Sequence, residues 1–206
     1  MVALGLTLMV AGCSHSTADR GVPASPTTAA RPDTLVVIGA DAAFGVGLSN
    51  SLRDSWPQML YLEAFPVSAV LVNGAVERAT VRSAASSQAR LAIDQHATVA
   101  AIWLDAPDSP CTATTTASTY VPDLDALIAP LRAANVRVLI GNISRAQPCS
   151  AAFDDAIDEV ASTRAATVVD LASALAANPA IGPRSSVTRS ISRTIAETFS
   201  AALASQ

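Results

Sequence analysis

The sequence feature that most constrains the fold is a short apolar run that ends in a glycine. Residues 35–38, three of which are β-branched, lead directly into Gly39. An uninterrupted apolar run bounded by turn residues is typical of a parallel strand that is buried on both faces. The glycines at Gly45 and Gly47 allow the following backbone to approach a ligand closely. In an open α/β sheet, binding sites form outside the carboxyl ends of the strands, so Asp41 lies where a functional residue is expected.

The rest of the chain alternates predicted strands with predicted helices. Further strands are expected at 67–72, 99–104, 136–140 and 167–171. Helices are expected from about 55 to 65, at 80–95, 123–135 and 151–163, and from about 186 to 204. This alternation favours right-handed crossovers and a parallel sheet with helices on both faces. We therefore predict a single three-layer α/β/α domain with a five-stranded parallel sheet over residues 34–206.

Charge and composition exclude one broad class of function. The formal net charge of −4 leaves no basic surplus to neutralise phosphates, which argues against a nucleic-acid-binding protein. A chain of 206 residues is long enough for one domain with a substantial core. We expect a monomer that needs no cofactor and no metal.

The N-terminus is predicted to be a targeting segment. Residues 2–10 are apolar but too few to span a bilayer, and Val10-Ala11-Gly12-Cys13 follows. This ending resembles a bacterial lipobox, which implies that Cys13 is lipidated and becomes the mature N-terminus. The alternative is an ordinary apolar N-terminus with a chance cysteine. We expect residues 1–13 to be the signal, 14–33 to be a flexible Ser/Thr/Pro-rich tether, and the protein to be anchored by lipid to the outer face of the cell membrane.

Several segments of the chain, in this order and spacing, resemble the SGNH/GDSL hydrolases, a family of flavodoxin-like esterases, lipases and acetylesterases. The first helix resembles that of actinobacterial members of the family. The matching segments are Val36-Val37-Ile38-Gly39 with Gly45-Val46-Gly47, Ser55-Trp56-Pro57-Gln58, Val72-Asn73-Gly74-Ala75 with Ala79-Thr80-Val81, Ile102-Trp103-Leu104 with Asp108, and Ile195-Ala196-Glu197 with Phe199. The resemblance implies a flavodoxin-like fold and a site at the carboxyl edge of the sheet.

The catalytic residues that the resemblance would supply are replaced. The Gly-Asp-Ser of the family, whose serine is the nucleophile, matches Gly39-Ala40-Asp41. The glycine of the oxyanion hole falls on Arg78, and the asparagine donor falls on Pro107. The family's last block, Asp-x-x-His, falls near residues 183–186, and no histidine follows His96.

The missing histidine decides the functional prediction. Acyl transfer by a serine needs a base that can take the hydroxyl proton. His15 lies in the tether, and His96 precedes the third strand, at the opposite edge of the sheet from the site. We therefore predict a catalytically inactive domain that binds an envelope glycan, lipid or protein. The alternative is a residual or rewired esterase or acetylesterase that acts on acyl groups of envelope molecules.

The charged residues near the predicted crevice allow two interpretations. Asp41, Asp105 and Asp108 could converge at the strand ends, where crowded carboxylates raise one another's pKa or hold a cation. Alternatively, each aspartate could accept hydrogen bonds from backbone N–H groups of its turn, with Arg78 as an ion-pair partner. We favour this second, structural interpretation.

Two cysteines are predicted to meet at the same edge. Cys111 and Cys149 follow the third and fourth strands, which should be neighbours. Disulfides persist in exported proteins, so we expect a bond between them that fixes the Thr-rich loop at 109–122. The alternative is a pair of free thiols.

Overall fold

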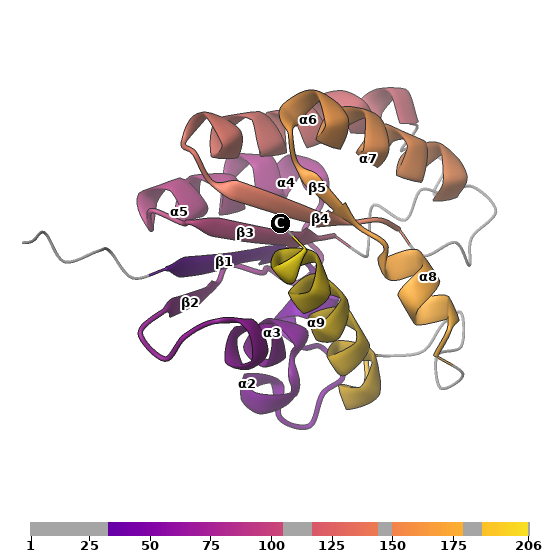
Figure 1. Ribbon diagram of the computed structural model, residues 1–206. Helices are drawn as coiled ribbons and strands as arrows, with labels where there is room; N and C mark the ends of the chain where they lie inside the picture. Colours follow the sequence, from indigo (N-terminus) through magenta and orange to yellow (C-terminus); the bar gives the residue numbers. More distant parts are fainter. Residues whose placement is uncertain (1–32, 105–116, 144–149, 179–186, 206) are drawn as a thin grey trace, which may run out of the picture. The chain divides into compact units, whose positions relative to one another are not determined.

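A five-stranded, all-parallel sheet forms the centre of the domain (Figure 1). The computed structural model describes residues 33–104, 117–143, 150–178 and 187–205. The strands are β1 (Thr34–Gly39), β2 (Val70–Asn73), β3 (Val99–Trp103), β4 (Arg137–Gly141) and β5 (Thr167–Val169), in the order β2-β1-β3-β4-β5. The predicted fold class and strand number are confirmed.

The chain divides into two units, Met1–Arg31 and Pro32–Gln206. The first unit, which contains Cys13, lies outside the described residues. In the described part of the second unit, no helix combines the length and the apolar character needed to cross a membrane.

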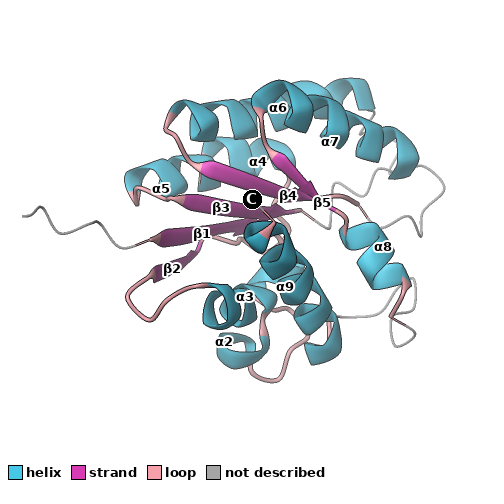
Figure 2. Ribbon diagram, viewed as in Figure 1, coloured by secondary structure: helices cyan, strands magenta, loops and turns pink. Residues whose placement is uncertain are grey.

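The described helices cover both faces of the sheet (Figure 2). On one face lie α4 (Val81–Ser86), α5 (Gln88–Asp94), α6 (Ala117–Ala133) and α7 (Ser150–Arg164). Contacts on the other face are made by α1 (Asp41–Phe44), α3 (Trp56–Ala64), α8 (Leu171–Ala176) and α9 (Arg189–Ala204), with α2 (Ser51–Asp54) next to α3.

The two hydrophobic clusters follow from the alternation of side chains along the strands. Val36 and Ile38 of β1 belong to the cluster under α4–α7, whereas Leu35 and Val37 belong to the cluster under α3 and α9. Every residue of β1 and β3 is buried, as expected for central parallel strands. In the second cluster, the ring of Trp56 stacks on that of Phe199 at a centroid distance of 5.1 Å, which joins α3 to α9.

Helix boundaries differ from the sequence predictions most clearly in two places. The helix expected at 80–95 is divided at Ser87 into α4 and α5. Residues 117–122, expected to be loop, form the first part of α6, with Pro122 inside the helix. There the ring of Tyr120 packs edge-on against Phe153 at 5.0 Å, so tertiary packing outweighs the local preference of Pro122.

The last predicted strand is shorter than expected. It ends at Val169, and Leu171 begins α8, a helix that the sequence analysis missed. The side chain of Asp170 accepts a hydrogen bond from the Ser173 N–H, which is a helix cap. Leu171 and Leu175 turn their side chains into the second cluster, so burial favours helix over a longer strand.

Candidate functional site

Asp41 lies at the carboxyl end of β1, as the first residue of α1. This helix has a single turn, because Gly45 adopts a left-handed φ of 91° directly after it. The N–H groups of Gly45 and Val46 both donate to the carbonyl oxygen of Asp41, at 2.9 and 3.0 Å. Strand, turn and glycine therefore present the Asp41 carboxylate at the edge of the sheet where the sequence places the site.

The Asp41 carboxylate is bound by the loop that follows β2. The backbone N–H of Arg78 donates to Asp41 Oδ1 at 2.6 Å. Arg78 has a φ of 58°, in the left-handed region that favours glycine. Among the described residues, the guanidinium of Arg78 forms no ion pair. Asp41 thus accepts a backbone hydrogen bond, but from a distant loop and not from its own turn, and the predicted ion pair of Arg78 with Asp105 or Asp108 lies outside the described residues.

A buried glutamine fixes the backbone just before Asp41. The Gly39 N–H donates to Oε1 of Gln88 at 2.8 Å, and Nε2 of Gln88 donates to the Gly39 carbonyl at 3.1 Å. The Gln88 carboxamide therefore pairs with Gly39 as a neighbouring strand would. Gln88 is 2% exposed, and the sequence analysis missed it. The sequence feature that could have identified Gln88 is a polar residue on the same helix face as the apolar Ala89 and Ala92.

The loop after β2 makes a second connection to α1. Asn73 ends β2, and its Nδ2 donates to the carbonyl oxygen of Ala43 at 2.9 Å. Its Oδ1 accepts from the Ala75 N–H at 3.1 Å, and the Val76 N–H donates to the Gly39 carbonyl at 3.2 Å. These bonds hold the loop and α1 together around Asp41.

Amide groups also organise the carboxyl ends of β4 and β5. Nδ2 of Asn142 donates to Oδ1 of Asp170 at 3.0 Å, and the Ala172 N–H donates to Oδ1 of Asn142 at 2.8 Å. Trp103 Nε1 donates to the Asn142 carbonyl at 3.3 Å. Asn142 thus joins β3, β4 and α8, which is a structural role.

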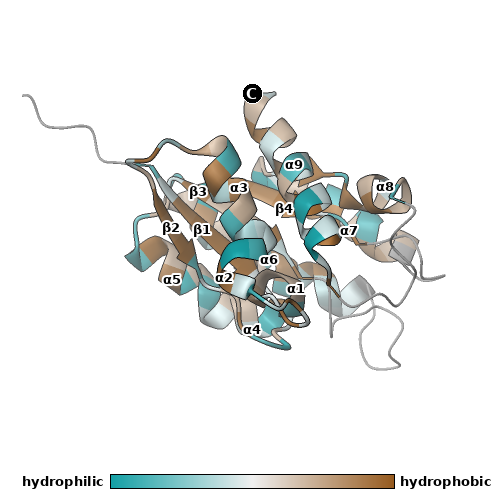
Figure 3. Ribbon diagram, turned by 90° about the horizontal axis from the view of Figure 1, so that it is seen from below, coloured by the Kyte–Doolittle hydropathy of each residue, from teal (hydrophilic) through white to brown (hydrophobic). Residues whose placement is uncertain are grey.

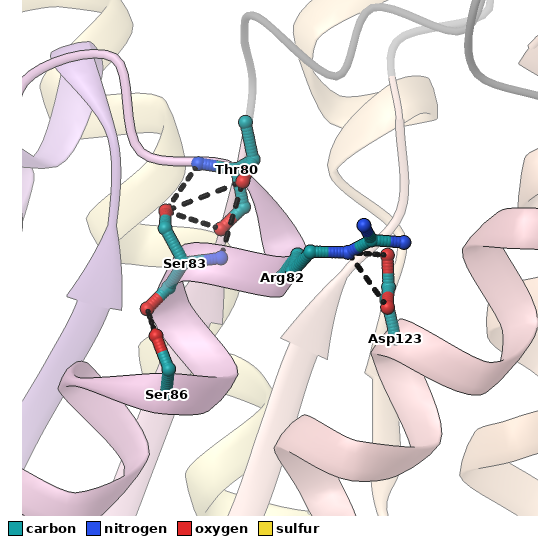
Figure 4. A network of polar contacts seen from close by, with 5 residues as sticks. All are labelled: Thr80, Arg82, Ser83, Ser86 and Asp123. Atoms are coloured by element: carbon teal, nitrogen blue, oxygen red, sulfur yellow. Dashed lines mark hydrogen bonds and ion pairs between the residues drawn. The ribbon is translucent and has the colours of Figure 1, made fainter.

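The start of α4 is fixed by a network of polar contacts (Figure 4). The Thr80 N–H donates to Ser83 Oγ at 2.8 Å, and the Ser83 N–H donates to Thr80 Oγ1 at 3.1 Å, which is a capping box. Nε of Arg82 pairs with Oδ2 of Asp123 at 3.1 Å and connects α4 to α6. This network begins two residues after Arg78, where its loop ends and α4 begins.

Apolar side chains are exposed on the two segments beside Asp41. Phe44 and Val46 follow Asp41 in the chain and are 52% and 39% exposed. Val76, in the loop that contains Arg78, is 51% exposed. Figure 3 shows the domain from the face of the sheet on which α2, α3 and α9 lie. The candidate site therefore combines one carboxylate with exposed apolar surface.

His96 lies where the sequence predicts, far from Asp41 in the fold. It occupies the turn between α5 and β3, is exposed, and has a left-handed φ of 53°. Asp105, Pro107 and Asp108 lie outside the described residues, as do Cys111 and Cys149. Within residues 33–104, 117–143, 150–178 and 187–205, no group of three or more His, Cys, Asp or Glu side chains could hold a metal ion.

Comparisons with known proteins identify the fold. No protein-family model matches the chain, and no curated protein matches it. The chain is similar in structure to the psychrotrophic esterase EstA from Pseudoalteromonas sp., with a TM-score of 0.68 and 18% identity over 84% of this chain and 97% of that one. It is also similar to a lipase/acylhydrolase from Enterococcus faecalis, with a TM-score of 0.68 and 13% identity over 83% of this chain and 95% of that one. A member of the lipolytic protein G-D-S-L family from Veillonella parvula is similar with a TM-score of 0.62 and 10% identity, over 80% of this chain and 94% of that one.

Proposed function

We propose that this chain, which has the SGNH/GDSL hydrolase fold, is a ligand-binding protein of the cell envelope that does not cleave esters. The observation that carries the proposal is the position of Asp41. A carboxylate stands at the end of β1, where the resemblance places a nucleophilic serine, and it accepts a hydrogen bond from the Arg78 N–H.

A carboxylate at this position is a poor substitute for serine. Serine attack needs a hydroxyl and a base within about 3 Å that accepts its proton. Attack by Asp41 on an ester would give an anhydride, which a further group would have to help hydrolyse. With Oδ1 bonded to the Arg78 N–H, the carboxylate is held in place as part of the scaffold.

Among the described residues, no histidine lies within reach of this edge. The chain has two histidines, His15 and His96. His96 precedes β3, and the length of that strand, about 16 Å at 3.3 Å per residue, separates the two edges of the sheet. A general base at that distance cannot act on a substrate next to Asp41.

Binding is supported by the surface beside the carboxylate. Phe44, Val46 and Val76 are exposed on segments that hydrogen bonds hold together. Exposed apolar side chains around a polar group are typical of a surface that a ligand covers. The proposed ligand is an envelope glycan, lipid or protein, and the proposed location is the outer face of the membrane, with Cys13 as the lipidated residue.

Hydrolysis of short-chain nitrophenyl esters tests the proposal. We expect the purified protein to show only background rates. Asp41→Ser should remain inactive, because its hydroxyl would still lack a base and catalytic groups of this kind act as a unit. Asp158→Asn, an exposed substitution on α7, is the matched control. Turnover by the natural protein that disappears in Asp41→Asn but persists in Asp158→Asn would favour a rewired esterase.

Retention experiments test the binding half of the proposal. Purified protein is mixed separately with peptidoglycan and with phosphatidylglycerol vesicles, and the sedimented fraction is measured. Retention that Asp41→Asn reduces and Asp158→Asn preserves would support a ligand site at this edge. Equal retention by both variants would place any ligand elsewhere.

A further inference from the structure

A cavity of about 560 Å³ opens at the amino edge of the sheet, the edge opposite Asp41. It lies between the starts of β3 and β4 and the last turns of α3 and α9. Its lining includes Asp33, Glu63, Phe65, Val99, Arg137 and Leu203. A volume of this size accommodates a small organic molecule.

Arg137 brings a fixed positive charge to this cavity. It is the first residue of β4, and its Nη2 donates to the carbonyl oxygens of Ala202 and Leu203 at 3.3 and 3.0 Å. These carbonyls belong to the last turn of α9, where they lack partners within the helix. Arg137 pairs with no carboxylate in the described part of the chain. Among the described residues, its guanidinium is therefore oriented by neutral carbonyl groups and not by a carboxylate.

Two carboxylates line the same cavity without neutralising that charge. Asp33 precedes β1, and Glu63 lies in the last turn of α3. Both residues are exposed, and neither forms an ion pair with another described residue. Residues of opposite charge thus line one cavity and form no ion pair with one another. A ligand that carries both signs on separate atoms would complement this arrangement, whereas a simple anion or cation would meet one favourable and one unfavourable charge.

We infer that this cavity binds a small zwitterion, with its carboxylate or phosphate at Arg137 and its amine at Glu63 and Asp33. The side chains of Phe65 and Leu203 provide apolar contacts for the body of the ligand. Free amino acids and phosphoethanolamine headgroups share this chemistry. The site lies at the other edge of the sheet from Asp41, so the inference does not depend on the proposed function.

Isothermal titration calorimetry on the purified full chain tests the inference. The probes are L-phenylalanine, O-phosphoethanolamine, 3-phenylpropionate and 2-phenylethylamine. We expect saturable binding of at least one zwitterion, and binding at least about tenfold weaker for the two singly charged compounds. Tighter binding of L-phenylalanine would indicate an amino-acid site, and tighter binding of O-phosphoethanolamine would indicate a headgroup site.

Charge-removing variants locate the binding. Arg137→Gln and Glu63→Gln should each weaken zwitterion binding about tenfold or more, whereas Arg193→Gln and Glu197→Gln, exposed charges on α9 outside the cavity lining, should leave it unchanged. If Arg137→Gln unfolds because the contacts of Arg137 with α9 are lost, binding by Glu63→Gln alone tests the inference. Absence of binding at about 10 mM, equal binding of the singly charged compounds, or unchanged binding by Glu63→Gln would overturn the inference. Asp41→Asn should bind normally, which separates this site from the one at the carboxyl edge.

Discussion

The backbone N–H of Arg78 donates a 2.6 Å hydrogen bond to Oδ1 of Asp41, a residue 37 positions earlier in the chain. The resemblance places the nucleophile of the family at one of these positions and a glycine of its oxyanion hole at the other. In this chain the two positions bind each other and join α1 to the loop after β2. Two positions that the resemblance associates with catalysis are thus joined by a structural contact.

Replacing Arg78 tests whether its backbone conformation is strained. A left-handed conformation costs a residue other than glycine about 1–2 kcal/mol in the folded state. Glycine avoids this cost, but its greater freedom in the unfolded chain makes folding less favourable by about 0.5–1 kcal/mol. Arg78→Gly should therefore raise the free energy of unfolding by up to about 1 kcal/mol in urea titrations. The control is Arg82→Gly, which lies within α4 and should be destabilised. Destabilisation by Arg78→Gly would contradict the expected strain.

Removing the acceptor of the same bond should have the opposite effect. Asp41→Ala should lower the free energy of unfolding by about 0.5–1.5 kcal/mol, because the Arg78 N–H loses its partner. Urea titration at pH 7 measures the change. An Asp41→Ala protein as stable as the natural one would show that the contact contributes nothing to the fold.

Gln88→Met tests the buried pairing with Gly39. Methionine nearly preserves the volume of glutamine but removes both hydrogen bonds, and the Gly39 N–H is left without its acceptor. An unsatisfied buried group costs about 1–3 kcal/mol, so the free energy of unfolding should fall by about that amount. Gln95→Met, at the exposed end of α5, should change it by less than about 0.5 kcal/mol. Equal effects of the two substitutions would refute a special role for Gln88.

The ion pair between α6 and α7 predicts a pH dependence of stability. Hydrogen bonds from Arg164 to Asp125, at 2.6 and 2.7 Å, hold the pKa of the Asp125 carboxyl below its usual value, against the opposing effect of burial. Because the folded pKa is lowered, the stabilisation is complete above the unfolded pKa of about 3.9 and is lost as the pH falls through the folded pKa.

Asp125→Asn should therefore melt at a lower temperature than the natural protein at pH 7, and the difference should shrink below about pH 4. The difference should be small, because both side chains are more than a third exposed and solvent screens the pair. Thermal melts from pH 7 to pH 3 measure it, with Asp158→Asn as the control. A difference that persists unchanged at pH 3 would mean that the effect is not electrostatic.

The membrane anchor is tested by Cys13→Ala. We expect the natural protein in the membrane fraction of expressing cells and the variant in the soluble fraction, because alanine cannot be lipidated. Cys149→Ala is the control for loss of a cysteine as such and should remain with the membrane. A Cys13→Ala protein that still sediments with membranes would contradict the lipobox prediction.

The predicted disulfide between Cys111 and Cys149 is tested by mass spectrometry of a non-reduced digest of protein isolated from the envelope. We expect the two peptides to be linked. Such a bond typically stabilises a fold by about 2–4 kcal/mol, so reduction should lower the melting temperature. Alkylation of both thiols without prior reduction would refute the prediction.

The sequence by itself determined the sheet and its layers. The apolar run at residues 35–38 predicted a central parallel strand because full burial on both faces requires uninterrupted apolar side chains, and β1 is buried throughout. The position of Asp41 at the end of that strand followed from the same argument, because the strand ends at Gly39. Local patterns sufficed for these features because they depend on the neighbours of each residue along the chain.

Only the tertiary structure decided which distant groups meet Asp41 and Gly39. The donor to Asp41 is the backbone N–H of Arg78, and every residue except proline has such a group, so no side-chain pattern could identify it. Gln88 reaches Gly39 across 49 positions because α5 packs against the sheet at that height. The start of α6 likewise depended on burial of Tyr120 against Phe153. Such contacts are set by the packing of helices on the sheet, a property of the folded chain that local sequence does not contain.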